Sequence, residues 1–582
     1  IGAGTTLALG SNSISHGLVT TSGASPLITG TGTITASTGF FFNHTGNTTI
    51  AAILAGSGGV LKAQANVVTL TGASTYTGTT EIQAGTLSIN SLTNVGGGAS
   101  ALGNAANAES GIIRMGLTTA ATTLQYTGSG HSSNRLIGMQ GSTGGVTLDA
   151  DGTGAFGLGG ARFEMAGDKT LTLRGSSAPA LDNTIGALVE IGGVLTLNKS
   201  DANTWLLIAV NTYTGVTQID DGTLKIGVND ALPVGTTVRL GTGATAGTLD
   251  LNGFDQTIAS LLVQTNSTTS ENELIVDATK TLTVTGAVTI GANVAASTTL
   301  FKATGGGSFV NNNSGGTFQV GGATGATFTN AATADFSGLG SFTLDLGTTG
   351  ILRIGDNSTA SSGVGASVLT LAPVSSITAG TVHIGANNNS VLSTLRLGST
   401  SNAISADTFN LGAVNGRSSG LVEFAGGTGT LTLRAADGTS RASVNLISNI
   451  FGTGANQTAT VNLAGHSADL LVSTLTNDAG IPDRIYGKHG TMELGGEPVL
   501  KFNGDFRDEF RAKNDGKDEA KIAVKPRRDQ VGNFLDVIRG GGPLHCNVEL
   551  GCATMVAIKM AVEAYRQRKT LTWDAKAERV VR

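Results

Sequence analysis

Two adjacent carboxylates, Asp220 and Asp221, are the residues of this sequence whose types best suit chemistry. A pair of carboxylates can supply the acid and the base, or nucleophile, for cleavage of a polysaccharide. The same stretch occurs once before in the chain, and there Gln83 and Ala84 stand at the matching positions. A pair that is absent from the first copy is better explained as part of a turn. We therefore interpret Asp220 and Asp221 as turn residues.

Three histidines of the long first part, His131, His383 and His466, stand alone in the sequence. No set of Cys, His or Asp at ligand spacing accompanies them, so we expect surface or turn histidines and no metal site. The glycine-rich string at residues 241–247 fails the test for a phosphate loop, because no helix pattern follows it. No calcium-binding nonapeptide repeat occurs either.

The last hundred residues hold both cysteines, Cys546 and Cys552. They flank the start of a predicted helix, and we interpret them as small buried residues rather than as a redox pair. His545 beside Cys546 could suggest a nucleophilic dyad, but side chains of adjacent residues rarely face each other. The sequence therefore predicts no catalytic, cofactor-binding or metal-binding residue, and no cofactor.

The strands and turns that position these residues can be predicted from a segment, here called the frame, that occurs twice in the chain. Residues 75–89 read TYTGTTEIQAGTLSI, and residues 212–226 read TYTGVTQIDDGTLKI. The odd spacing from Ile82 to Leu87 would put the two on opposite faces of one strand, so a turn must separate them. Gly85 and Gly222 lie in that gap, and glycine can adopt the positive φ that such a corner needs. Residues that vary within the frame, such as Glu81 against Gln218, are expected to point outward.

Short alternating strands recur along the first 480 residues, with Gly, Thr, Ser, Asn and Ala between them. Examples are LTL at 171–173, VLTL at 194–197, LTV at 282–284, FTLDL at 342–346, STLRL at 393–397 and LTLR at 431–434. This pattern predicts an elongated parallel β-helix (solenoid) with ~20 to 25 residues per coil, which gives ~20 coils. A series of antiparallel sandwiches is the alternative, but two-residue Asn-Gly hairpin signals are scarce.

Composition divides the 582 residues into two parts. Residues 481–582 hold 19 of the 35 Lys and Arg and 15 of the 40 Asp and Glu, so the first part has a net charge of −9 and the second of +4. A sparse acidic balance without basic stripes argues against nucleic acid as a partner. The basic run at residues 525–528 has no interleaved aromatic residues, so we interpret it as a solvated segment. No apolar run is long enough to span a membrane.

The first part resembles a known repeat family in three linked motifs. These are GGVL at residues 58–61 and 192–195, the frame itself, and GTLDLNGFDQTIASL at residues 247–261. Together they are similar to the autotransporter-associated β-strand repeat, most clearly over residues 58–90 and 192–262. The resemblance implies that residues 1–480 form a right-handed β-helical passenger of an exported bacterial surface protein. Ile1 already lies in a strand pattern with no signal peptide before it, so we expect the sequence to begin inside a longer protein.

The second part changes periodicity. Residues 529–539 and 552–569 have apolar residues at helical spacing, and residues 488–494 and 498–502 read as strands. The stretches YGKHGTMEL and NFLDVIRGGGPLHCNVELGCATMVAIKMAVEAYRQRKTLTWDAKAERVV resemble the C-terminal end of Gfo/Idh/MocA-type oxidoreductases. That family binds a nicotinamide cofactor in a Rossmann domain and uses a Glu-Lys-Pro lysine. Lys525-Pro526 lacks the Glu and lies far too late in the chain, so residues 481–582 are expected to be a small incomplete α/β segment without a cofactor.

These features leave three functions open. The first is a non-catalytic stalk or adhesin-like passenger, extracellular or on the outer cell surface, with cell-surface or polysaccharide ligands. The second is a fragment or fusion of an NAD(P)-dependent oxidoreductase, whose ancestry would be cytoplasmic. The third is a chimeric reading frame with no single function. The missing Rossmann motif favours the first.

Overall fold

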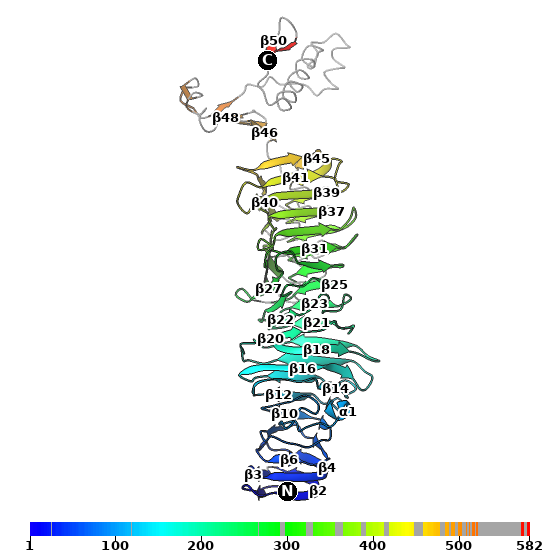
Figure 1. The fold of residues 1–582 in the computed structure, drawn as a ribbon. Helices are drawn as coiled ribbons and strands as arrows, with labels where there is room; N and C mark the ends of the chain where they lie inside the picture. The colour runs from blue at the N-terminus through cyan, green and yellow to red at the C-terminus, as the bar shows by residue number, and fades with distance from the viewer. Residues whose placement is uncertain are drawn as a thin grey trace. The chain divides into compact units, whose positions relative to one another are not determined.

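The computed structural model describes residues 1–24, 26–117, 119–265, 267–291, 297–321, 330–355, 365–385, 391–412, 418–446, 458–477, 483–487, 490–494, 499–502, 508, 511–512, 515–517, 519–521, 572–574 and 579–581. The chain divides into two compact units, Ile1–Ala479 and Gly480–Arg582. In the first unit, short strands stack one above another along the chain (Figure 1).

Every described strand pair of the first unit is parallel, and the strands form two long stacks. Sheet I contains β5 (Thr48–Ile50), β8 (Val67–Leu70), β10 (Gly85–Ile89), β12 (Thr122–Tyr126), β15 (Val146–Ala150), β17 (Lys169–Arg174), β19 (Leu195–Lys199), β21 (Thr217–Ile219), β23 (Thr237–Leu240), β26 (Ser260–Val263), β29 (Val288–Ile290), β32 (Thr317–Val320), β35 (Ile351–Ile354), β37 (Val374–Ile384), β39 (Ser401–Leu411), β42 (Ala442–Leu446) and β45 (Val472–Asn477). A second column of sheet I begins at β25 (Gln256–Ile258) and continues through β28 (Thr281–Val284), β31 (Ser308–Asn312), β34 (Ser341–Asp345), β37, β39, β41 (Thr430–Arg434) and β44 (Ser467–Leu470).

Sheet II contains β2 (Ile14–Gly23), β4 (Thr33–His44), β6 (Ile53–Ala55), β7 (Gly59–Lys62), β9 (Thr80–Ile82), β11 (Ile113–Met115), β13 (Ser129–Ser132), β14 (Leu136–Met139), β16 (Gly154–Phe163), β18 (Asn183–Val189), β20 (Thr204–Leu207), β22 (Gly222–Ile226), β24 (Gly247–Asp250), β27 (Glu271–Ile275), β30 (Ser297–Thr304), β33 (Asn330–Asp335), β36 (Val368–Thr370), β38 (Leu392–Leu397), β40 (Ser419–Phe424) and β43 (Ala459–Asn462). Two short strands, β1 (Thr6–Ala8) and β3 (Leu27–Thr29), pair with each other, and a four-residue helix, α1 (Ala108–Gly111), interrupts one coil. The unit is therefore a parallel β-solenoid, as the strand pattern predicted.

Coil length differs from the uniform ~20 to 25 residues expected from the repeat. Ile50 lies opposite Leu70, Ile89 opposite Tyr126 and Val320 opposite Ile354, so the offset varies between 20 residues (70 − 50), 37 (126 − 89) and 34 (354 − 320). The later coils carry a third strand and longer connections.

The shared frame is used for internal packing in both copies. Ile82, Leu87 and Ile89 are fully buried, as are Ile219, Leu224 and Ile226. The frame tyrosine is also buried each time, and its hydroxyl forms a hydrogen bond with the hydroxyl of the threonine four residues later. The oxygen–oxygen distance is 2.7 Å for Tyr76–Thr80 and 2.6 Å for Tyr213–Thr217. Burial raises the pKa of Tyr76 to about 12 and raises that of Tyr213 further.

The predicted glycine corner is confirmed, since φ is +71° at Gly85 and +66° at Gly222. A Cβ at Gly222 would lie 2.3 Å from the carbonyl oxygen of Asp201, so the close approach of the neighbouring coil also requires glycine.

The two copies of the frame occupy the two sheets in opposite order. In the first copy, β9 belongs to sheet II and β10 to sheet I; in the second, β21 belongs to sheet I and β22 to sheet II. The same corner therefore serves two different edges of the solenoid. Outward residues of the matching strands, such as Glu81 and Gln218, accordingly lie on different sheets.

In the second unit, β46 (Asp483–Gly487), β47 (Gly490–Leu494), β48 (Val499–Phe502) and β49 (Glu519–Lys521) form an antiparallel sheet. A further antiparallel pair joins β50 (Thr572–Asp574) and β51 (Arg579–Val581). The strands predicted at residues 488–494 and 498–502 are confirmed as β47 and β48. The helices predicted at residues 529–539 and 552–569 lie outside the described residues.

Candidate functional site

Asp220 and Asp221 follow β21 and lead into the corner at Gly222. The side chain of Asp220 accepts a hydrogen bond from Gln218 Nε2 at 2.9 Å, and burial raises its pKa. Asp221 Oδ1 accepts one from the backbone N–H of Gly222 at 2.8 Å. Each carboxylate thus bonds to a neighbour in the chain, one beside the strand and the other within the corner. These contacts support the interpretation as turn residues.

A buried lysine lies beside this corner in both copies, and the sequence reasoning did not identify it. Lys199 Nζ donates to the carbonyl oxygens of Ser200 at 2.7 Å, Asp201 at 2.5 Å and Asp221 at 3.0 Å. Lys62 Nζ donates in the same way to the carbonyl oxygens of Gln64 and, at 3.0 Å, Ala84.

Burial lowers the pKa of both ammonium groups to about 8. Both lysines bond to a backbone oxygen at the position where the two copies differ, Ala84 and Asp221. The side chain at that position is therefore free to vary. Lys62 and Lys199 lie 137 residues apart, which is also the spacing of the two frames, and each stands among apolar residues. This shared spacing was the sequence signal that could have identified the buried lysines.

The three histidines named from the sequence lie far apart along the solenoid. His131 lies on β13, where its Nδ1 is 2.6 Å from the hydroxyl oxygen of the buried Tyr126. His383 lies within β37, and its Nδ1 is 3.2 Å from Asn410 Nδ2. Burial and the nearby Arg353 lower the pKa of His383 to about 4. His466 stacks on Phe424 with ring centroids 3.8 Å apart. His131 and His383 thus lie in strands, and all three contact other side chains.

A second pair of carboxylates belongs to Asp149, near the end of β15, and Asp151, directly after it. Burial raises the pKa of Asp149, although Arg174 Nη2 donates to its Oδ2 at 2.8 Å. Burial would also raise the pKa of Asp151, but bonds from the backbone N–H and Oγ of Ser176 lower it overall. Different pKa values in a carboxylate pair are typical of acid–base sites. Here Asp149 is only 3% exposed and ion-paired, so a substrate could not reach it.

Residues 241–246 connect β23 to β24, which begins at Gly247, so a strand rather than a helix follows this string, as expected. Lys525, Pro526, His545, Cys546 and Cys552 lie outside the described residues. Among the described residues, no three His, Cys, Asp or Glu side chains gather to hold a metal ion. In the same part of the chain, no helix is long and apolar enough to cross a membrane.

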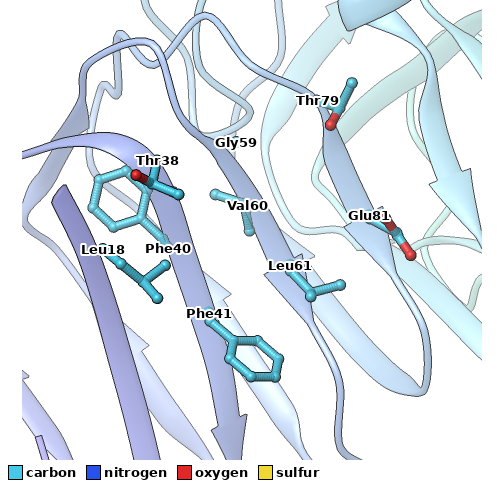
Figure 2. Close-up of a pocket in the computed structure, with 10 residues that line it drawn as sticks. Leu18, Thr38, Phe40, Phe41, Gly59, Val60, Leu61, Thr79 and Glu81 are labelled. Carbon is cyan, nitrogen blue, oxygen red and sulfur yellow. The ribbon is translucent and has the colours of Figure 1, made fainter.

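Two shallow grooves hollow the outer surface of the early coils. One, of about 300 Å³, lies on sheet II over β2, β4, β7 and β9, and its lining includes Leu18, Phe41, Leu61 and Glu81 (Figure 2). The other, of about 550 Å³, lies near β3, β5 and β8 and is lined by Pro26, Leu27, Asn47, Val67 and three threonines. Only the first combines an aromatic ring, aliphatic side chains and a carboxylate.

Comparison with known proteins finds passenger repeats in two segments of the chain. The family model described as passenger-associated-transport-repeat matches residues 60–89 and 197–226, which hold the two frames and their buried lysines. The chain is similar to the Adhesin BmaC autotransporter of Brucella suis biovar 1 (strain 1330), at 34% identity over 253 residues. That match covers 40% of this chain and 7% of the Brucella protein, so the chain spans only a small part of this relative. No solved structure matches the chain.

Proposed function

We propose that the solenoid is a non-catalytic, surface-exposed or secreted bacterial passenger that acts as a stalk or adhesin through its outward faces. The observation that carries this proposal is how the repeat uses its residues. The apolar residues that the two copies share are buried and the shared glycine forms the corner, whereas outward positions such as Glu81 and Gln218 differ. Shared threonines such as Thr75 and Thr212 are exposed and could belong to outward rows in both copies. The likeness to an autotransporter adhesin supports the same reading. Ligands at a cell or polysaccharide surface would be bound by these varied outward rows.

The direct test is adhesion of the full chain. Fluorescent beads coated with the folded protein should bind cultured epithelial cells or polysaccharide-coated wells in a saturable way, and excess soluble protein should compete. Beads coated with heat-denatured protein are the control. If native and denatured coats behave alike on every surface, or if the chain degrades the polysaccharide, the proposal is wrong.

For residues 481–582 we propose an inactive C-terminal fragment of a Gfo/Idh/MocA-type oxidoreductase, fused to the passenger. The proposal rests on the resemblance of the sequence, and β47 and β48 lie where the residue pattern predicted strands. Hydride transfer from a nicotinamide cofactor requires a binding site for the cofactor pyrophosphate, and no Rossmann motif occurs in the sequence. Calorimetric titration of the full chain with NADH and NADPH should therefore give no binding heat. Saturable micromolar binding would contradict this assignment.

A further inference from the structure

The groove on sheet II is hollow because two outward positions have no side chain. Leu18 of β2 lies opposite Gly39 of β4, and Gly39 lies opposite Gly59 of β7. A Cβ at Gly59 would lie 2.2 Å from the carbonyl oxygen of Thr79, and Gly39 has φ +151°, which side chains rarely adopt. The backbone of successive coils therefore requires glycine here, and the hollow is a fixed feature of the fold.

One side of the hollow is an apolar wall. Phe41 and Leu61 lie opposite each other on β4 and β7, and both point outward between fully or nearly fully buried neighbours. Leu18 is 54% exposed and stands beside the hollow on β2. Figure 2 shows these three side chains around the groove, with Phe41 presenting an aromatic ring. Phe41 is half-buried, and an aromatic ring that reaches the surface next to aliphatic side chains favours a ligand with a flat apolar face.

The rim supplies a few polar groups. Glu81 of β9 lies opposite Leu61 of β7. The hydroxyls of Thr38 and Thr79 also line the groove. Gln83 Nε2 donates to Glu81 Oε1 at 2.7 Å, which holds that carboxylate in place. The groove lining contains a carboxylate and no cation, so it disfavours an anionic ligand and suits one that donates hydroxyl hydrogens. Arg114 of β11 lies opposite Glu81 on the far side from Leu61, and it forms ion pairs with Glu109 and Glu164.

The second copy of the repeat lacks the same combination. Thr196 takes the place of Gly59, Asn198 that of Leu61, and Gln218 that of Glu81. The groove is therefore a product of the outward residues and not of the shared frame. This is the pattern expected of a specific site built on a repeated scaffold.

We propose that this groove binds one pyranose ring of a neutral polysaccharide. The apolar face of the ring would stack on Phe41 and contact Leu61 and Leu18. Its hydroxyls would donate to the Glu81 carboxylate and exchange hydrogen bonds with Thr38 and Thr79. The inference deepens the proposed adhesive function and rests on it, because a bound sugar would be held and not cleaved.

The test uses the full chain and defined probes in calorimetric titration. Cellohexaose and laminarihexaose are the neutral probes, hexagalacturonate is the anionic one, and an octapeptide of alternating Val and Thr tests an apolar peptide. We expect saturable binding of at least one neutral hexaose and none of hexagalacturonate. Phe41→Ala should weaken that binding at least tenfold, whereas Phe41→Trp should retain it.

Two further variants complete the design. Glu81→Gln should weaken binding severalfold, because it loses the charged acceptor. Leu206→Ala, which truncates an outward leucine of β20 on the same sheet, is the matched control and should bind as the unchanged protein does. The thermal midpoint of each variant shows that it remains folded.

Three results would overturn the groove proposal. These are no saturable binding of either neutral hexaose, undiminished binding by Phe41→Ala, or binding of the peptide or hexagalacturonate in preference to the neutral probes. The bead adhesion assay on the same preparations judges the adhesive function separately. Adhesion without hexaose binding would thus reject this site and leave the adhesive function supported.

Discussion

The tyrosine and threonine of the shared frame form a buried hydroxyl pair in both copies, and the lysine before them bonds to the backbone of the corner. A polar group inside an apolar solenoid is tolerated because it is hydrogen-bonded. The frame therefore combines apolar packing with a small set of satisfied polar contacts. The carboxylates of Asp220 and Asp221 do not belong to this set, because Lys199 donates to the backbone oxygen of Asp221 and not to its side chain.

Asp221→Ala should change the free energy of unfolding by less than about 1 kcal/mol, because the variant keeps the carbonyl oxygen that Lys199 contacts. Lys199→Met should cost about 2 kcal/mol or more, since three carbonyl oxygens lose their donor. Urea unfolding of the full chain, followed through the solenoid's circular dichroism, measures both. A larger loss for Asp221→Ala than for Lys199→Met would contradict this account of the corner.

The buried lysines also predict a pH dependence. Burial lowers the pKa of Lys62 and Lys199 to about 8, whereas lysines of the unfolded chain keep an ordinary value near 10.5. Between these values the unfolded chain binds more protons, so the free energy of unfolding should rise with pH in this window. Above about pH 10, Tyr76 and Tyr213 oppose the effect, because their pKa values are raised in the folded state.

Thermal midpoints recorded from pH 8 to pH 10 test this expectation. The unchanged chain should become more stable across the range, and the double variant Lys62→Met, Lys199→Met should show a flatter profile. A profile of the same slope in both proteins would mean that other groups control the pH dependence.

At the scale of the element, the corner is the part that the sequence specifies most strictly. A glycine with positive φ lets two three- to five-residue strands meet with their apolar residues on one interior. The structure uses this same corner at different edges of the solenoid in the two copies, since the order of sheets I and II is reversed. The repeat therefore encodes a strand–corner–strand unit and leaves open which edge it occupies.

Gly222→Ala should be strongly destabilising, by about 3 kcal/mol or more, because the added Cβ would meet two backbone carbonyl oxygens at a positive φ. Gly235 offers a matched control. It lies before β23 in the same region, has no positive φ, and a Cβ there would meet nothing within 4 Å. Gly235→Ala should therefore change stability by less than about 0.5 kcal/mol. Equal effects of the two substitutions in urea unfolding would show that the corner does not need glycine.

At the scale of the molecule, the described strands of residues 1–479 find all their pairing partners within that unit. A solenoid whose coils contact mainly their neighbours needs no distant domain to complete its core. We therefore expect a fragment of residues 1–479 to fold alone and to give a far-ultraviolet circular dichroism spectrum typical of β-structure. A spectrum dominated by helix, or an unfolded fragment, would refute this.

The sequence by itself determined the local rules of this protein. Alternation in Leu224 and Ile226 set which side chains enter the core, and the odd spacing around Gly222 required a corner, because strand period and backbone sterics act over a few residues. It also indicated two parts of different architecture and the solenoid class of the first.

Only the tertiary structure decided how the coils register. It assigned the two frames to the sheets in opposite order, lengthened the later coils, paired Asp149 with Arg174, and brought Leu18, Gly39, Leu61 and Glu81 from four strands to one groove. These residues lie about twenty or more positions apart from strand to strand. Their meeting depends on the offset of each coil against the next, and the connecting loops set that offset while the strand pattern leaves it free.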